Sequence, residues 1–219
     1  MSPNLDNENL DEATREWLKT MPDNKVFEWL GTDSEGIPNY LHLLNLNWSP
    51  KGVDADLQFF NEVARSLAGE PNYLRQMIHT EFWRHTLVAC ISVILLEAKQ
   101  YCSDLADSFM QPNFVSPQIA VALGLLCPNQ AISFLGEVVR GAKRIPEPEN
   151  YKRELAIYSY PKAICAAQTV VSKLEPKLAA ELGKSDIFQH HRNHPDGQIG
   201  ADVAEHHWEF WSGVIKKRI

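Results

Sequence analysis

Residues 82–139 form a succession of apolar segments, and none of them alternates apolar and polar residues as a half-buried strand does. The pattern is clearest over residues 116–139, where one apolar run ends at Pro128-Asn129 and a second begins at Gln130. This pattern predicts a helix, a two-residue break and another helix. A helix pair buries one face only when a further pair stacks on it. The sequence therefore predicts an all-α fold of stacked antiparallel helix pairs, arranged either as a solenoid or as an irregular bundle.

Apolar periodicity and flanking Pro and Gly residues predict helices in the rest of the chain as well. These are expected at residues 10–21, 54–68, 71–78, 82–96, 99–110, 154–174, 176–182 and 203–217. Pro161 is expected to kink or break the helix in which it lies. Residues 40–46 are too few for periodicity to decide between a helix and a buried strand. Loops are predicted at residues 31–39, 140–151 and 185–200.

These elements divide the chain into two predicted parts. Residues 1–53 are expected to hold an N-terminal helix and an irregular arm that packs on the main domain. Residues 54–219 are expected to form a helical-repeat-like domain.

The net charge of −7 bears on the kind of partner the chain can bind. An acidic surface repels the phosphate backbone, so nucleic-acid binding is disfavoured. The same surface attracts a basic protein and accelerates its encounter. Charge thus predicts a basic protein partner.

No segment looks like a membrane span or a secretory signal. The first residues are polar and acidic, without a basic and an apolar region in succession. The longest apolar stretch, residues 86–96, is too short for a bilayer and is flanked by Arg84 and Glu97. A cytoplasmic protein without a membrane partner is therefore expected.

The four cysteines are widely spaced, with no C-x-x-C motif. Cys90, Cys127 and Cys165 lie in apolar helical runs, which is typical of reduced, buried cysteines in cytosolic proteins. Cys102 lies at the start of a predicted helix, where the pKa of a thiol can be lowered. An apolar packing role is nevertheless the favoured interpretation for a helical cysteine.

Five histidines near the C-terminal end were considered as metal ligands: His190, His191, His194, His206 and His207. Their spacing matches no zinc motif, although Asp202 and Glu205 lie close in sequence. The favoured interpretation is a surface segment with titratable histidines and no metal.

The chain has no nucleophile elbow and no glycine-rich phosphate loop. No catalytic residue and no cofactor are therefore predicted. Trp208 and Trp211 share a face of the last predicted helix. They are expected to cover the end of the core, and the alternative is an exposed anchor for a partner.

Three sequence segments, residues 82–84 (Phe-Trp-Arg), 95–106 and 121–126, carry a resemblance to a protein family. They resemble bacterial helical proteins whose genes lie beside polymorphic toxin genes, and they are similar to HEAT-like helical repeats. The resemblance covers roughly residues 75–140. It implies an immunity or inhibitor protein in bacterial competition and supplies no catalytic residues.

The function predicted from the sequence is therefore a cytoplasmic, non-enzymatic immunity protein that binds and neutralises a cognate, basic antibacterial toxin. The candidate partner contacts are Asp104, Asp107, Glu137, Glu147, Glu149, Trp208 and Trp211. The alternative is a small helical enzyme. It would be a HEAT-like DNA glycosylase, against which the acidic charge counts, or a metal-dependent hydrolase that uses the C-terminal histidines.

Overall fold

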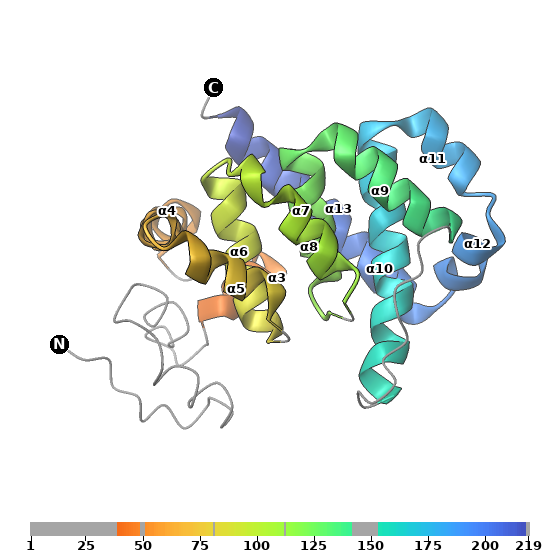
Figure 1. Cartoon of the computed structure of the whole chain (residues 1–219), viewed down its shortest axis with the longest axis horizontal. Coiled ribbons are helices and arrows are strands. Elements are labelled where there is room, and N and C mark those ends of the chain that lie inside the picture. Colours follow the sequence, from red (N-terminus) through yellow and green to blue (C-terminus); the bar gives the residue numbers. More distant parts are fainter. Residues whose placement is uncertain (1–38, 49–50, 81, 112, 142–152, 218–219) are drawn as a thin grey trace. The chain divides into compact units, whose positions relative to one another are not determined.

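The computed structural model describes residues 39–48, 51–80, 82–111, 113–141 and 153–217. Within these ranges every regular element is a helix and no strand occurs, which confirms the all-α prediction (Figure 1). The chain divides into two compact units, residues 1–71 and residues 72–219, whereas the sequence places the boundary at residue 53. The helix predicted at residues 10–21 lies outside the described residues.

The first unit contains α3 (Asn39–Asn45) and α4 (Val53–Ala68). The segment that periodicity left undecided is thus a helix. Asp54 and Asp56 lie in the first turn of α4, where the partial positive charge of the helix terminus favours carboxylates. Phe60 and Leu67 are buried on one face of α4, which agrees with the predicted apolar face.

The second unit contains the remaining elements, in chain order and with the following bounds. They are α5 (Pro71–His79), α6 (Trp83–Leu95), the 3-10 turn η1 (Lys99–Tyr101), α7 (Cys102–Phe109), α8 (Ser116–Leu126), α9 (Pro128–Arg140), α10 (Arg153–Leu174), α11 (Pro176–Leu182), α12 (Asp186–Arg192) and α13 (Pro195–Lys216).

The core of this unit is built around α8 and α10. The middle of α8, residues 119–123, is completely buried, because α6, α7, α9, α10 and α13 all pack on this helix. The last helix, α13, packs on α10 and also returns to α8. In a solenoid each repeat contacts only its neighbours in sequence. The packing of α13 on α8 is therefore that of an irregular bundle.

The loop predicted at residues 185–200 is wrong, because these residues form α12 and the first turns of α13. Ser185 caps α12 by accepting a hydrogen bond from the N–H of Phe188 at 3.2 Å. His194 caps α13 by accepting one from the N–H of Asp196 at 3.2 Å, and Pro195 occupies the first helical position. Caps thus mark the starts of these two helices.

Two other predictions differ from the structure in detail. Pro161 lies inside α10, which continues through it, so the predicted break does not occur. The break between α8 and α9 is the single residue Cys127, whose φ of −136° and ψ of 66° are not helical. Pro128 starts α9 instead of ending α8, since proline is well suited to the first turn of a helix.

Candidate functional site

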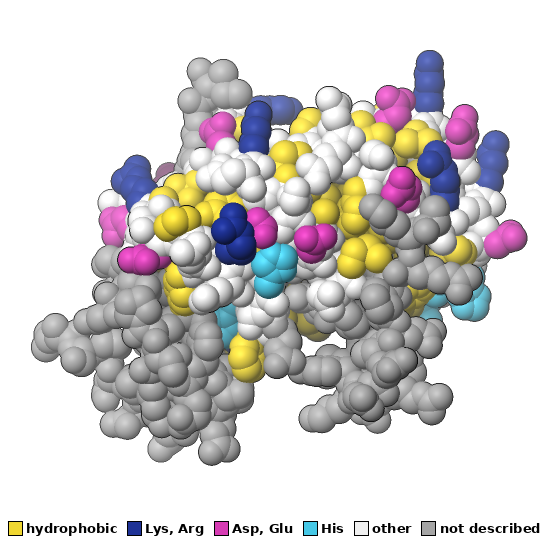
Figure 2. Space-filling view, in the orientation of Figure 1, with side chains coloured by type: hydrophobic (Ala, Val, Ile, Leu, Met, Phe, Trp, Pro, Cys, Tyr) yellow, Lys and Arg dark blue, Asp and Glu magenta, His cyan; other side chains and the backbone are white. Residues whose placement is uncertain are grey.

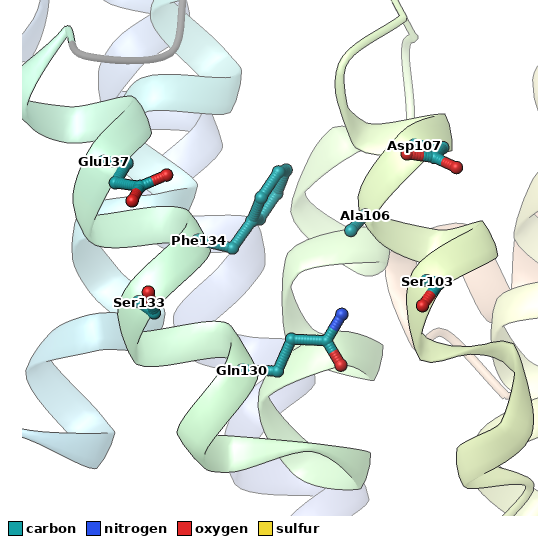
Figure 3. Close-up of a pocket in the computed structure, with 7 residues that line it drawn as sticks. All are labelled: Ser103, Ala106, Asp107, Gln130, Ser133, Phe134 and Glu137. Atoms are coloured by element: carbon teal, nitrogen blue, oxygen red, sulfur yellow. The ribbon is translucent and has the colours of Figure 1, made fainter.

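A groove runs between α7 and α9, on top of α8, against which both helices pack. The two helices run in the same direction, since Ser103 and Gln130 lie at one end and Asp107 and Glu137 at the other (Figure 3). The groove has a volume of about 450 Å³. The residues that line it are Ser103, Ala106, Asp107, Gln130, Ser133, Phe134 and Glu137. These seven residues define the α7/α9 groove.

The middle of the groove is apolar and the edges are polar. Ala106 and Phe134 are buried, and the ring of Phe134 packs edge-on against Phe109 of α7, with 5.9 Å between the ring centroids. Gln130 and Phe134 extend from α9 toward α7 (Figure 3). Ser133 is exposed at the edge of α9. The α7/α9 groove can thus accept the apolar stem of a side chain and offer hydrogen bonds around it.

The end of the groove near Asp107 and Glu137 is negative because of these two carboxylates and because two helices end there. Asp107 lies in the last turn of α7 and Glu137 in the last turn of α9. Both carboxylates therefore stand where the partial negative charge of a helix C-terminus disfavours an anion. Arg140, in the same last turn of α9, offsets part of this charge. Figure 2 shows acidic side chains over both α7 and α9, with uncharged surface between them.

A disulfide between Cys102 and Cys127 lies at the other end of the groove, with 6.5 Å between the Cα atoms. Cys102 is the first residue of α7, and Cys127 directly precedes α9. The prediction of reduced cysteines is therefore wrong for this pair. Their sequence separation of 25 hid the pairing, because nothing local in the sequence indicates which distant helix ends meet.

Cys90 and Cys165 are free and buried, as the sequence indicated. Burial raises the pKa of the Cys165 thiol to about 11, although Arg192 opposes the shift. Burial also raises the pKa of the Cys90 thiol well above its usual value. Both thiols are therefore protonated at neutral pH, which makes them poor nucleophiles.

No family model, curated protein or solved structure matches this chain. In addition, no helix among the described residues combines the length and apolar composition needed to cross a bilayer.

Asp104, predicted as a partner contact, is engaged within the protein. Its carboxylate accepts hydrogen bonds from Arg75 Nε at 3.1 Å and pairs with His79 Nε2 at 2.8 Å, and both partners lie on α5. The guanidinium of Arg75 also lies 5.6 Å from the centroid of the Tyr101 ring. Asp104 thus links α5 to α7 at the side of the groove.

The remaining predicted contacts have different surroundings. Glu147 and Glu149 lie outside the described residues. Trp211 is completely buried, so the alternative of an exposed anchor is wrong for it and the core-covering interpretation is confirmed. Trp208 is half-buried, and its ring lies over Gly124 of α8 so closely that a side chain at 124 would overlap it. Of the predicted contacts that the structure describes, only Asp107 and Glu137 line the α7/α9 groove.

The histidines are distributed over two separate places. His190 and His191 lie in the last turn of α12, with 4.9 Å between their ring centroids, and His191 also packs edge-on against Tyr160 at 4.9 Å. On α13, His206 is exposed, while His207 is buried with Nε2 3.3 Å from the side-chain amide nitrogen of Gln118. Within the part of the chain that the structure describes, no three His, Cys, Asp or Glu residues are arranged to hold a metal ion.

Proposed function

We propose that this chain is an immunity-type protein that captures a basic toxin domain and neutralises it by occupying its surface. One observation carries the proposal: the α7/α9 groove, which ends in two carboxylates placed at helix C-termini. A cation that enters this end is attracted both by the carboxylates and by the partial charges of the helices. The net charge of −7 adds long-range attraction for a basic partner.

The lining of the groove favours an arginine side chain over a lysine. The planar guanidinium presents several N–H donors at once, and carboxylates, amides and hydroxyls accept them. Gln130, Ser103 and Ser133 supply such acceptors along the edges. The ring of Phe134 supplies a surface on which a guanidinium or an apolar stem can pack.

Protein binding accounts for the groove better than hydrolysis does. Among the described residues that line it there is no histidine, cysteine or lysine. A catalytic serine needs a base such as histidine or lysine beside it. A catalytic carboxylate pair usually has one carboxyl group in an apolar, buried setting, whereas Asp107 is exposed and Glu137 is half-buried. The groove instead combines an apolar middle with a polar edge, which is the organisation of a protein-binding surface.

The proposal also concerns the cellular compartment in which the protein works. The sequence favours the cytoplasm, where small thiols keep cysteines reduced, whereas a Cys102–Cys127 disulfide persists in oxidising compartments. Cytoplasmic location therefore stays a prediction. Cell fractionation, followed by thiol labelling of the protein in each fraction, tests it.

The direct experiment is to co-express the chain with the protein encoded by the neighbouring gene and to measure their affinity. The test variant combines Asp107→Asn with Glu137→Gln. The matched control combines Glu181→Gln with Glu209→Gln, which removes the same charge from exposed positions on α11 and α13. We expect the groove variant to weaken the complex at least about tenfold and the control to leave it within about twofold. Equal affinities for the two variants would remove the groove from the interface.

A further inference from the structure

The Cys102–Cys127 disulfide joins the two helices that form the walls of the α7/α9 groove, at the end opposite the carboxylates. Cys102 directly precedes Ser103, and Cys127 lies three residues before Gln130, and both of these neighbours line the groove. Farther along, the walls touch through the rings of Phe109 and Phe134. One end of the binding surface is thus held by a covalent bond that thiols can break.

We propose that the redox state of this disulfide controls the affinity of the α7/α9 groove. In the oxidised protein the walls are fixed and the groove is ready for a cationic segment. In the reduced protein the first turn of α7 is released from α9, and binding weakens. The inference deepens the proposed function, on which it rests, by assigning a regulator to the same site.

The two sulfur atoms differ in accessibility, which determines how reduction proceeds. Cys102 is only 3% exposed, whereas Cys127 is half-buried and within reach of solvent. The thiolate of a dithiol reductant therefore attacks the sulfur of Cys127, a mixed disulfide forms there, and the bond to Cys102 breaks. The second thiol of the reductant then displaces Cys127. The protein gains two electrons and two protons, and the reductant becomes a disulfide.

Accessibility sets this direction of attack. Cys102 is the first residue of α7 and Cys127 directly precedes α9, so both sulfurs lie at a helix N-terminus and the helix dipole favours neither as the leaving group. The partly exposed sulfur of Cys127 is thus the one attacked.

Reduction acts on a short helix whose first turn is held to α5 by Asp104 and to α9 by the disulfide. The residues of α7 run only from Cys102 to Phe109, and a helix of this length depends on its tertiary contacts. Leu105 and Phe109 are buried and hold the middle and the end. Without the disulfide, the turn that carries Ser103 loses its link to α9. A ligand must then order this turn when it binds, which lowers the affinity.

The test uses the full chain and, as probe, a fluorescent peptide in which arginine alternates with alanine. Its dissociation constant is measured for the oxidised protein, for the protein reduced by a dithiol, and for the variant Cys102→Ser with Cys127→Ser. We expect binding to weaken about tenfold on reduction and equally in the double variant. Added dithiol should not change binding by the double variant, which serves as the control for reductant effects.

A second measurement guards against a variant that fails to fold. Hydrogen exchange is measured for the native protein in its oxidised and reduced forms. The reduced form should exchange faster in the first turn of α7, and the protection of α8 should be the same in both forms. Slow exchange across α7 in both forms overturns the inference. So does a disulfide that a dithiol cannot reduce without denaturant.

The outcomes separate this inference from the proposed function. Equal affinity of the oxidised and reduced forms, with loss of binding in the variant Asp107→Asn with Glu137→Gln, overturns redox control and leaves the groove as the binding site. If this groove variant binds as tightly as the native protein, the proposed site is wrong. Redox control of that site is then wrong as well.

Discussion

Gly200 of α13 lies directly against the backbone of Lys162 in α10, so closely that a side chain at position 200 would overlap it. This contact is where the last helix crosses the middle of α10. The glycine that suggests a loop in the sequence instead allows two helices to approach. The contact also makes a sharp comparison possible, because Gly213, in the same helix, has no neighbour within 4 Å of an added methyl group.

The first prediction is that Gly200→Ala destabilises the protein by about 1–3 kcal/mol, because α13 must move away from α10. Gly213→Ala should instead stabilise it by about 0.5–1 kcal/mol, because alanine favours the helix. Urea denaturation of both variants measures the two free energies of unfolding. Equal effects of the same sign would show that α13 does not cross α10 at this point.

Leu123→Asp is expected to abolish stable folding. Leu123 is completely buried in α8, and an unpaired carboxylate there costs several kcal/mol, on the order of the whole stability of a domain. Ala180→Asp, at an exposed position of α11, is the control and should fold normally. Circular dichroism and thermal melting compare them, and a melting temperature of Leu123→Asp near that of the native protein would contradict the burial of α8.

Asp104→Ala tests a structural role against a role in partner binding. Removal of the carboxylate leaves Arg75 and His79 without this partner, and we expect a loss of about 1 kcal/mol in the free energy of unfolding. The affinity for a basic partner should change little. A double-mutant cycle with Arg75→Ala measures the coupling. A large loss of affinity with unchanged stability would show that Asp104 contacts the partner.

Stability should decrease in mild acid through His191. Its pKa is lowered by burial and by the neighbouring His190 and His194. The folded-state pKa therefore lies below the unfolded value of about 6.5, so protons bind the unfolded chain more readily. This contribution to stability is complete above about pH 6.5 and is lost as the pH falls through the folded-state value. His191→Gln should flatten the decline in unfolding free energy between about pH 7 and 5. His206→Gln, at an exposed position, is the control.

Association with a basic partner should depend strongly on salt. An increase from about 50 to 500 mM shortens the Debye length from roughly 14 to 4 Å. The association rate should then fall about tenfold or more, while the dissociation rate changes less. Stopped-flow measurement over this range checks the expectation. A rate that does not vary with salt would exclude electrostatic capture.

The sequence predicted the helices that are specified by apolar periodicity and by nearby proline and glycine residues. Pro128 and the apolar periodicity around it identified α8 and α9, although Pro128 starts the second helix and does not end the first. It missed α12, because Ser185 specifies that helix through a cap and its residues carry no apolar stripe. Local signals thus account for most helices.

The candidate site depends on relationships that no local pattern contains. Asp107 and Glu137 were recognised as acidic contacts, but their position at the same end of one groove requires α7 and α9 to run in the same direction on α8. The pairing of Cys102 with Cys127 follows from the same arrangement. Trp211 is buried and therefore is not a surface contact, and its burial follows from the packing of α13.

The return of α13 to α8 and α10 has a consequence for how the protein is made. Chains emerge from the ribosome at about 5–20 residues per second, N-terminal part first. The central helices α8 and α10 thus emerge before α13, the helix that covers them, has been synthesised. Until then their apolar faces are open to other nascent chains and to chaperones. A ribosome that stalls before residue 195 would leave a product that collapses and aggregates, whatever the stability of the finished fold.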